Sequence, residues 1–211
     1  MKNIIFIAPP AAGKGTQSHM LKENYNYSHL STGDMLREAI NSGSDLGLLV
    51  KNIIEKGELV SDDIMIDLIN DKLTSSKGKP FILDGFPRTL NQAKALENII
   101  NDDYEVVYLD LQEEEAIERI LGRLTCSCGK SYNINVDGLK PKQDGICDSC
   151  GKKLIKRNDD NEESFKVRFE SFVNNTRPVL DYYEKKNKLH KIDVNRDVLD
   201  IFDDILRIVN D

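Results

Sequence analysis

The sequence lacks both a long hydrophobic run and an excess of positive charge. No stretch approaches the ~20 consecutive apolar residues that a membrane-spanning helix needs. Lysine and arginine total 29 and aspartate and glutamate total 36, which gives a formal net charge of −7. Long-range attraction to polyanions needs net or regional positive charge. We therefore expect no nucleic acid and no membrane among the partners of this chain.

The N-terminus also lacks the long hydrophobic region of a secretory signal. The apolar run within MKNIIFIAPP ends at Pro9 and Pro10, which makes a signal peptide an unfavourable interpretation. No internal repeat is present. Hydrophobic residues make up 39% of the 211 residues and charged residues 31%, which is enough to build a core and cover it with charge. We expect a cytoplasmic, monomeric protein built around one core.

Four short apolar segments have the composition of strands buried on both faces of a sheet: 3–8, 81–84, 106–111 and, more weakly, 189–194. Polar, helix-favouring segments lie between them, beginning with one that runs to about Leu21. Residues 198–209 show the i, i+3, i+4, i+7 spacing of apolar residues that an amphipathic helix needs. This alternation of strands and helices predicts a doubly wound α/β sheet.

Two segments depart from that alternation. Residues 31–60 read as helices broken at Gly33, Gly43, Gly47 and Gly57. Residues 124–158 are polar and Gly-rich, and they hold all four cysteines of the chain. We interpret both as insertions into one core, which comprises residues 1–30, 61–123 and 159–211.

A Gly-Lys-Gly-Thr motif at 13–16 stands at the junction of an Ile-rich strand and a helix. Backbone N–H groups at a helix N-terminus form a nest that favours anions. The lysine adds a charge for a phosphate, and the threonine hydroxyl can ligate Mg²⁺ or a phosphate oxygen. Ala8 stands where the usual pattern has its first glycine, and Ala11 stands at a second common glycine position. A left-handed backbone at either alanine would cost ~1 kcal/mol or more, and an ordinary strand-to-helix turn stays the alternative.

Further motifs resemble those of the adenylate kinase family. The segments at 31–37 (STGDMLR) and 84–89 (DGFPRT), with Gln92 after them, are similar to the two nucleoside-monophosphate motifs of that family. Arg119, Arg123, the Arg-Asn-Asp-Asp segment at 157–160 and Arg168 also match in order and spacing. The resemblance covers residues 1 to about 195. It implies a three-layer P-loop nucleoside triphosphate hydrolase-like fold with a five-stranded parallel sheet, an AMP-binding segment at 31–60 and a zinc-binding lid at 124–158.

The resemblance also implies the reaction ATP + AMP ⇌ 2 ADP, with Mg²⁺ as cofactor and with ATP, AMP and ADP as ligands. The ATP-binding residues that it implies are Ala11, Ala12, Gly13, Lys14, Gly15, Thr16, Arg119, Arg123, Ser131, Tyr132 and Arg196. For AMP they are Thr32, Arg37, Glu58, Leu59, Val60, Gly85, Phe86, Pro87, Arg88, Gln92, Arg157 and Arg168. The implied catalytic residues are Lys14, Arg88, Arg123, Arg157, Asp159 and Arg168. Asp84 is the carboxylate expected to position Mg²⁺-bound water, and Asp159 is expected to orient the lid arginines.

Physical chemistry agrees with these residue types. A loose phosphoryl-transfer transition state needs charge stabilisation more than a strong base, and the planar guanidinium of arginine suits phosphate. Six of the nine arginines fall in the motifs, although any one of them taken alone fits a surface ion pair equally well. Gln92 offers the donor and the acceptor that an adenine edge requires. Transfer to UMP or CMP, and nucleotide binding without catalysis, are the alternative functions. The three histidines lie outside the motifs and are assigned no catalytic role.

The cysteines form two pairs, Cys126-x-Cys128 and Cys147-x-x-Cys150. They resemble the zinc knuckles of the adenylate kinase lid, although the first pair has one intervening residue where the family has two. Four thiolates satisfy tetrahedral Zn²⁺ and leave no open position, so the metal is expected to be structural. Two disulfides, or free thiols in a lid held by hydrogen bonds, are the alternatives.

Overall fold

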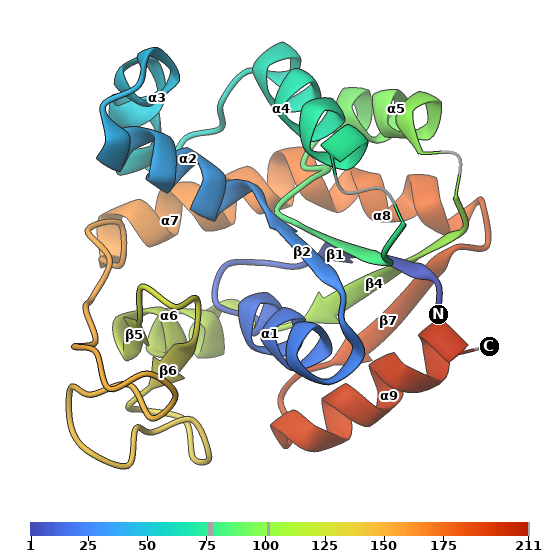
Figure 1. Cartoon of the computed structure of the whole chain (residues 1–211). Coiled ribbons are helices and arrows are strands. Elements are labelled where there is room, and N and C mark those ends of the chain that lie inside the picture. Colours follow the sequence, from blue (N-terminus) through green and yellow to red (C-terminus); the bar gives the residue numbers. More distant parts are fainter. Residues whose placement is uncertain (76–77, 101, 211) are drawn as a thin grey trace.

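A five-stranded parallel sheet forms the centre of the structure, which is a computed structural model describing residues 1–75, 78–100 and 102–210. The strands are β1 (Asn3–Ile7), β2 (Ser28–Ser31), β3 (Phe81–Asp84), β4 (Tyr104–Asp110) and β7 (Leu189–Asp193), in the spatial order β2-β3-β1-β4-β7. Helices cover both faces of this sheet (Figure 1). The α/β class and the five-stranded parallel sheet expected from the sequence are confirmed.

Alternate residues of each central strand enter two separate cores. Ile5 and Ile7 of β1 belong to one hydrophobic cluster and Ile4 and Phe6 to the other, because successive side chains of a strand point to opposite faces. All five residues of β1 are buried. This double burial explains why the segment reads as a continuous apolar run.

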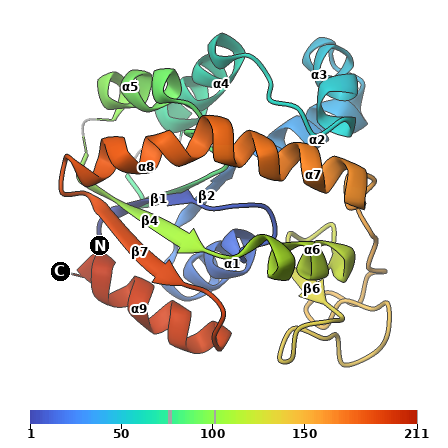
Figure 2. The same ribbon diagram turned by 180° about the vertical axis from the view of Figure 1, so that it is seen from behind.

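The helices of the core are α1 (Lys14–Tyr25), α4 (Asp62–Ser75), α5 (Leu90–Ile99), α6 (Glu113–Leu121), α7 (Glu162–Ser171), α8 (Arg177–Glu184) and α9 (Val198–Asn210). A π-helical turn, η1 (Phe172–Thr176), joins α7 to α8, and the three run as one long rod across the sheet (Figure 2). The amphipathic helix predicted over 198–209 is confirmed, while α1 continues one turn beyond the predicted Leu21.

The first predicted insertion, residues 31–60, contains α2 (Thr32–Ser42) and α3 (Asp45–Glu55). Gly43 caps α2 with a left-handed φ of 67°, and Gly57 follows α3 with a φ of 79°, as the predicted breaks require. The predicted breaks at Gly33 and Gly47 are wrong, because both residues lie inside the first turn of a helix. A Cβ atom on Gly47 would overlap the backbone of Ala39, so this glycine permits close packing of α3 on α2.

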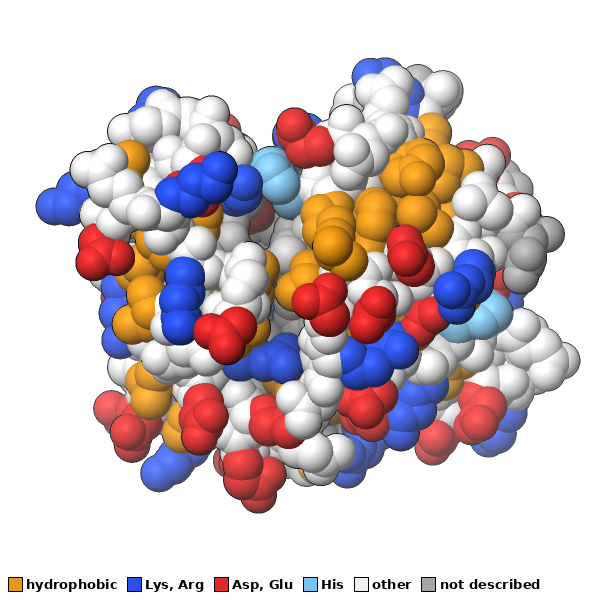
Figure 3. Space-filling view, turned by 90° about the horizontal axis from the view of Figure 1, so that it is seen from below, with side chains coloured by type: hydrophobic (Ala, Val, Ile, Leu, Met, Phe, Trp, Pro, Cys, Tyr) orange, Lys and Arg blue, Asp and Glu red, His pale blue; other side chains and the backbone are white. Residues whose placement is uncertain are grey.

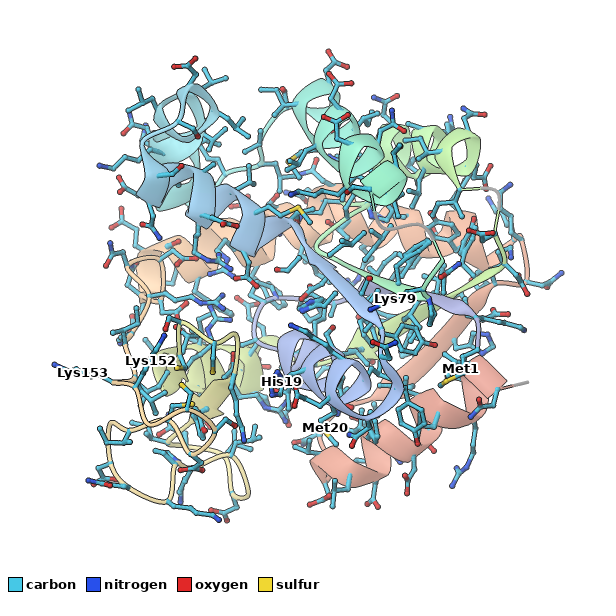
Figure 4. All side chains as sticks on the ribbon, in the orientation of Figure 1. Met1, His19, Met20, Lys79, Lys152 and Lys153 are labelled. Carbon is cyan, nitrogen blue, oxygen red and sulfur yellow. The ribbon has the colours of Figure 1, made fainter. Side chains whose placement is uncertain are left out.

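The second predicted insertion, residues 124–158, has little regular structure. Strands β5 (Arg123–Thr125) and β6 (Ser131–Asn133) form a two-stranded antiparallel sheet, and loops make up most of the rest. The segment 124–158 lies beside α6 and α7, and Figure 4 shows Lys152 and Lys153 on its outer edge. From below, the surface is hollowed between this lid segment and the core (Figure 3). Within the described residues, no helix has both the length and the apolarity needed to cross a membrane.

The lid segment is fastened to the end of α6 by two asparagines. The Nδ2 of Asn133 donates to the carbonyl of Arg119 at 2.7 Å, and the Nδ2 of Asn135 donates to the carbonyl of Glu118 at 2.9 Å. The bond from Asn133 gives a partner to a carbonyl of the last helical turn, whereas the Glu118 carbonyl also accepts from the backbone N–H of Gly122. The two asparagine bonds also join the lid to the helix that carries Arg119.

Candidate active site

A large cavity lies at the carboxyl edge of the parallel sheet, where open α/β sheets bind ligands. We call it the donor cavity. The loop after β1, the Asp84–Gly85 turn after β3 and Val194 after β7 all reach it. Of the residues predicted to bind ATP or Mg²⁺, it is lined by Ala11, Ala12, Gly13, Lys14, Gly15, Thr16, Asp84, Arg119, Arg123, Ser131, Tyr132 and Arg196. The structure thus brings the whole predicted set together.

The loop between β1 and α1 has the form of an anion nest. Gly13 adopts φ 92° and ψ 8°, α1 begins at Lys14, and the backbone N–H of Thr16 donates to the Gly13 carbonyl. Ala11 is also left-handed, with a φ of 63°, whereas Ala8 is not among the residues of positive φ. One of the two glycine replacements therefore carries backbone strain and the other does not.

Lys14 is held inside this cavity among other cations. The pKa of Lys14 is lowered from 10.5 to about 8, chiefly by burial; Asp84 opposes this shift, while Arg88, Arg168 and Arg123 add to it. The folded chain thus binds the Lys14 proton less tightly than the unfolded chain. The ammonium destabilises the ligand-free fold fully below pH 8, and this cost fades as the pH rises from 8 toward 10.5.

Asp84 stands at the end of β3 and stays ionised. Burial alone would raise the pKa of this carboxyl, but the hydrogen bond from His29 and the charge of Lys14 outweigh burial and lower the pKa to about 2. The His29 Nε2 lies 3.3 Å from Asp84 Oδ2. His29, which sequence reasoning left without a role, is therefore a direct neighbour of a predicted site residue.

Two consecutive carboxylates hold two arginines. Asp160 accepts from both the Nε and the Nη2 of Arg123, with the Nε bond at 2.9 Å, and Asp159 accepts from Arg168 Nη1 at 3.0 Å. Sequence reasoning assigned the orienting role to Asp159 and missed Asp160, whose side chain is completely buried. Burial and the charge of Arg123 lower the pKa of Arg168 to about 10.

Arg157 completes this cluster from the lid side. Its Nη2 lies 4.0 Å from Asp34 Oδ1, and Asp34 also pairs with Arg37 at 2.5 Å. Burial, with Arg123 and Arg37, lowers the pKa of Arg157 to about 10. The cluster therefore holds more positive charge than its carboxylates compensate.

A second cavity, which we call the acceptor cavity, lies beneath α2 and α3. Of the residues predicted to bind AMP, it is lined by Thr32, Arg37, Glu58, Leu59, Val60, Gly85, Arg88, Gln92 and Arg168. Three others lie elsewhere: Phe86 is fully buried in the core, Pro87 lines a smaller neighbouring hollow, and Arg157 faces the donor cavity. The two cavities share Gly33, Arg37, Gly85, Arg88 and Arg168.

Gly85 lies where the two cavities meet. Its φ is 87°, and a Cβ on it would lie 2.5 Å from Thr32 Oγ1 and 3.0 Å from Arg88 Nη2. Arg88 in turn donates from Nε to the Gly85 carbonyl at 2.8 Å. Glycine is therefore required here for both backbone conformation and space, and it keeps Arg88 pointing at the junction.

At the far end of the donor cavity, Arg119 and Arg196 flank Val194. Arg119 Nη2 donates to the Val194 carbonyl at 2.9 Å, and Arg196 Nε donates to the Asp193 carbonyl at 3.1 Å. Tyr132 lines the cavity from the lid; its hydroxyl accepts from the Asp148 N–H at 2.7 Å and also lies 3.5 Å from Cys147 Sγ.

The four cysteine sulfurs lie within 4.8 Å of one another. Cys126 Sγ lies 3.3 Å from Cys150 Sγ, and Cys128 Sγ lies 3.7 Å from Cys147 Sγ. A tetrahedron with Zn–S bonds of ~2.3 Å has sulfur–sulfur edges of about 3.8 Å, so the donor set and its spacing fit Zn²⁺. The single residue between Cys126 and Cys128 does not prevent the four thiols from converging. No disulfide joins them.

Comparison with known proteins agrees with this geometry. The adenylate kinase family model matches residues 6–188. The adenylate kinase of Thermosipho africanus is 45% identical over 98% of this chain and 99% of its own length. That of Petrotoga mobilis is 43% identical over 98% of this chain and 96% of its own length, and that of Treponema denticola is 47% identical over 90% and 91%.

Proposed function

This chain belongs to the adenylate kinase family, and we propose that its donor and acceptor cavities hold ATP and AMP in the arrangement that phosphoryl transfer needs. The activity is the reversible transfer of a phosphoryl group between ATP and AMP. The observation that carries the residue assignment is the junction at which Arg37, Arg88 and Arg168 line both cavities. Two nucleotides bound there would meet with their phosphates among these guanidinium groups.

In this proposal, the residues of the junction stabilise charge and align the reacting groups. Lys14 and the nest at 11–16 bind the ATP phosphates, while Arg88 and Arg168 span the transferring group. Arg123 and Arg157 reach it from the lid side. Because the transition state spreads negative charge over the equatorial oxygens, fixed guanidinium groups lower its free energy without taking part in bond making.

Fixed carboxylates keep those guanidinium groups in place. Asp160 holds Arg123, and Asp159 holds Arg168, so each arginine loses less conformational freedom when it binds phosphate. Closure of the lid over the phosphates would exclude water, which otherwise competes as the phosphoryl acceptor.

Mg²⁺ accompanies the nucleotides of adenylate kinases. When bound, it supplies positive charge to the phosphate oxygens. Asp84 and Thr16 are the residues of this chain that we propose to hold it, Asp84 through water. The carboxylate of Asp84 suits this role because it stays ionised beside Lys14.

We further propose a structural Zn²⁺ on Cys126, Cys128, Cys147 and Cys150. The lid has a very small hydrophobic cluster, made of Cys126, Tyr132, Cys147 and Leu154 with Leu124 packed against it. Such a segment needs a second source of stability, which a metal bound by four thiolates supplies. Thiolate ligands fit the reducing cytoplasm.

One chain supplies every residue of both cavities, which supports a monomer as the working unit. Light scattering at the assay concentration tests this assignment.

The test of the residue assignment is a coupled assay of ADP formation with AMP, UMP and CMP as acceptors. We expect AMP to be strongly preferred and Arg88→Ala to lower kcat/KM by about a hundredfold or more. Arg207→Ala, on the exposed face of α9, is the matched control and should leave the rate unchanged. Preference for UMP or CMP, or nucleotide binding without turnover, would favour the alternative functions.

A further inference from the structure

Both ends of the Gln92 side-chain amide are held by the protein. Its Oε1 accepts from the backbone N–H of Arg88 at 2.7 Å, and its Nε2 donates to Asp62 Oδ1 at 2.8 Å. Gln92 is 2% exposed and lines the acceptor cavity. Its amide is therefore fixed in rotation at the wall where an acceptor base would meet it.

These two partners also determine which end of the amide is oxygen. A backbone N–H can only donate, and a carboxylate can only accept. Turning the Gln92 amide by 180° would set N–H against the Arg88 N–H and oxygen against the Asp62 carboxylate. The hydrogen-bond network therefore selects one orientation, with one lone pair of Oε1 and one N–H of Nε2 still free for a ligand.

Asp62 is itself fixed by residues close to Gln92. The Thr89 hydroxyl lies 3.0 and 3.1 Å from the two oxygens of Asp62, and Asn91 Nδ2 donates to Oδ2 at 3.0 Å. The Thr89 oxygen also accepts from the backbone N–H of Gln92. The carboxylate at the start of α4 thus joins the first turn of α5 in a single network.

We propose that Asp62 is a positioning residue for acceptor specificity: it orients the Gln92 amide to accept the edge of a 6-aminopurine monophosphate and to reject that of a 6-oxopurine. This inference rests on the proposed role of Gln92 at the acceptor base. Adenine has an acceptor at N1 and a donor at its 6-amino group, whereas hypoxanthine has a donor at N1 and an acceptor at its 6-oxo group. If the donor and acceptor of the Gln92 amide are fixed, binding of the hypoxanthine edge leaves buried hydrogen-bonding groups unpaired. Such unpaired groups discriminate strongly between similar ligands.

The test compares AMP with IMP as phosphoryl acceptors at saturating ATP. The bases of AMP and IMP differ only at N1 and the 6-position, so the ratio of their kcat/KM values reports the reading of that edge. Asp62→Asn keeps the shape of the side chain but can donate to a turned Gln92 amide. We expect the AMP:IMP ratio to fall about tenfold, which corresponds to about 1.4 kcal/mol, mainly through KM.

Asp63→Asn is the matched control. Asp63 is the other acidic residue in the first turn of α4, and it is exposed. Its replacement should leave the AMP:IMP ratio unchanged. An equal fall in Asp63→Asn would assign the effect to the helix terminus and overturn the proposal.

Gln92→Leu separates this inference from the proposed function. Because Asp62 acts through Gln92, Asp62→Asn should lower the ratio in the wild-type background and have no further effect in Gln92→Leu. If Gln92→Leu abolishes the preference for AMP but Asp62→Asn leaves the ratio within twofold, the role of Asp62 is wrong and that of Gln92 stands. If Gln92→Leu itself leaves the ratio unchanged, the proposed role of Gln92 is wrong and the inference falls with it. Should Asp62→Asn fail to fold, Asp62→Ser retains a residue favoured at helix starts and gives the same comparison.

Discussion

Ala11, in the loop that we propose to bind phosphate, offers a test of backbone strain with a built-in control. Its φ of 63° lies in the left-handed region, where an L-residue with a Cβ costs ~1–2 kcal/mol relative to glycine. Ala11→Gly removes that cost but adds ~0.4–1 kcal/mol of chain entropy to the unfolded state. It also removes one partly buried methyl group from the edge of a hydrophobic cluster. We expect a net gain in unfolding free energy of about 0.5 kcal/mol.

Ala8→Gly is the control because Ala8 is not left-handed and is partly buried like Ala11. It pays the same entropy and loses a similar methyl group without relief of strain, so it should destabilise the protein by about 1 kcal/mol. The difference between the two variants therefore isolates the strain and should be about 1–2 kcal/mol. Urea unfolding of zinc-loaded protein, followed by circular dichroism, measures both values.

Equal destabilisation by Ala8→Gly and Ala11→Gly would refute this reasoning, since it would mean that the left-handed alanine costs nothing. The nest is already formed around Gly13, so we expect both variants to change nucleotide affinity only modestly. A gain in turnover of several orders of magnitude in either variant would instead show that the natural loop is impaired.

Three other predictions follow from the site. Lys14→Met should abolish activity yet stabilise the ligand-free protein at pH 7 by on the order of 2 kcal/mol, with a smaller gain at pH 9.5, as measured by urea unfolding; a loss of stability at pH 7 would contradict it. Removal of metal by a chelator should speed proteolysis within 124–158 and lower the melting temperature, while activity measured in the cold falls less. An unchanged melting temperature after verified loss of zinc would exclude a structural metal. Asn133→Ala should raise KM for ATP more than KM for AMP, because it loosens the end of α6 that carries Arg119. Asn98→Ala is the control, because Asn98 also donates to a helix carbonyl, that of Lys94 in α5.

Three of the strands predicted from sequence, β1, β3 and β4, share one physical signal, because nearly all of their residues are buried. The fourth, β7, was indicated only weakly, and it is an edge strand in which Ile192 alone is buried. Strand β2 (Ser28–Ser31) was missed because it lies at the edge of the sheet and only Leu30 among its residues is buried. Composition alone does not separate such a strand from a loop. Gly47 was misread for a related reason: its absent side chain makes room for Ala39, and that contact between two helices exists only in the folded chain.

The site shows the same division between local and distant information. Nearly every residue predicted to bind ATP or AMP lines one of the two cavities, because each motif is a continuous stretch on one loop or helix start, but other lining residues, such as His29 and Met65, lie outside the motifs. They did not reveal which carboxylate holds which arginine. Asp159 and Asp160 are adjacent in sequence, yet one side chain pairs with Arg168 on α7 and the other with Arg123 at the start of β5.

His29 and Asp62 illustrate the limit more sharply. His29 comes from β2 and meets Asp84 across 55 positions of sequence, and Asp62 comes from α4 and meets Gln92 across 30. Neither belongs to a motif that carries a ligand. Their importance lies in the orientation of a partner, which depends on how strands and helices pack and cannot be read from residue type.

The net charge of −7 and the cationic cleft, formed by the arginines and Lys14 where the two cavities meet, act over different distances. Charges separated by more than ~8–10 Å are largely screened at physiological ionic strength, so the whole-chain sum bears on polyanions and surfaces, not on a ligand inside the cleft. Within the cleft, burial and neighbouring cations lower the pKa values of Lys14, Arg157 and Arg168. In the proposed binding mode, a phosphate that enters the cluster relieves this crowding, which destabilises the cations in the ligand-free protein. The fold therefore favours nucleotide binding in advance, because it holds an uncompensated cationic cluster that lowers the stability of the ligand-free protein.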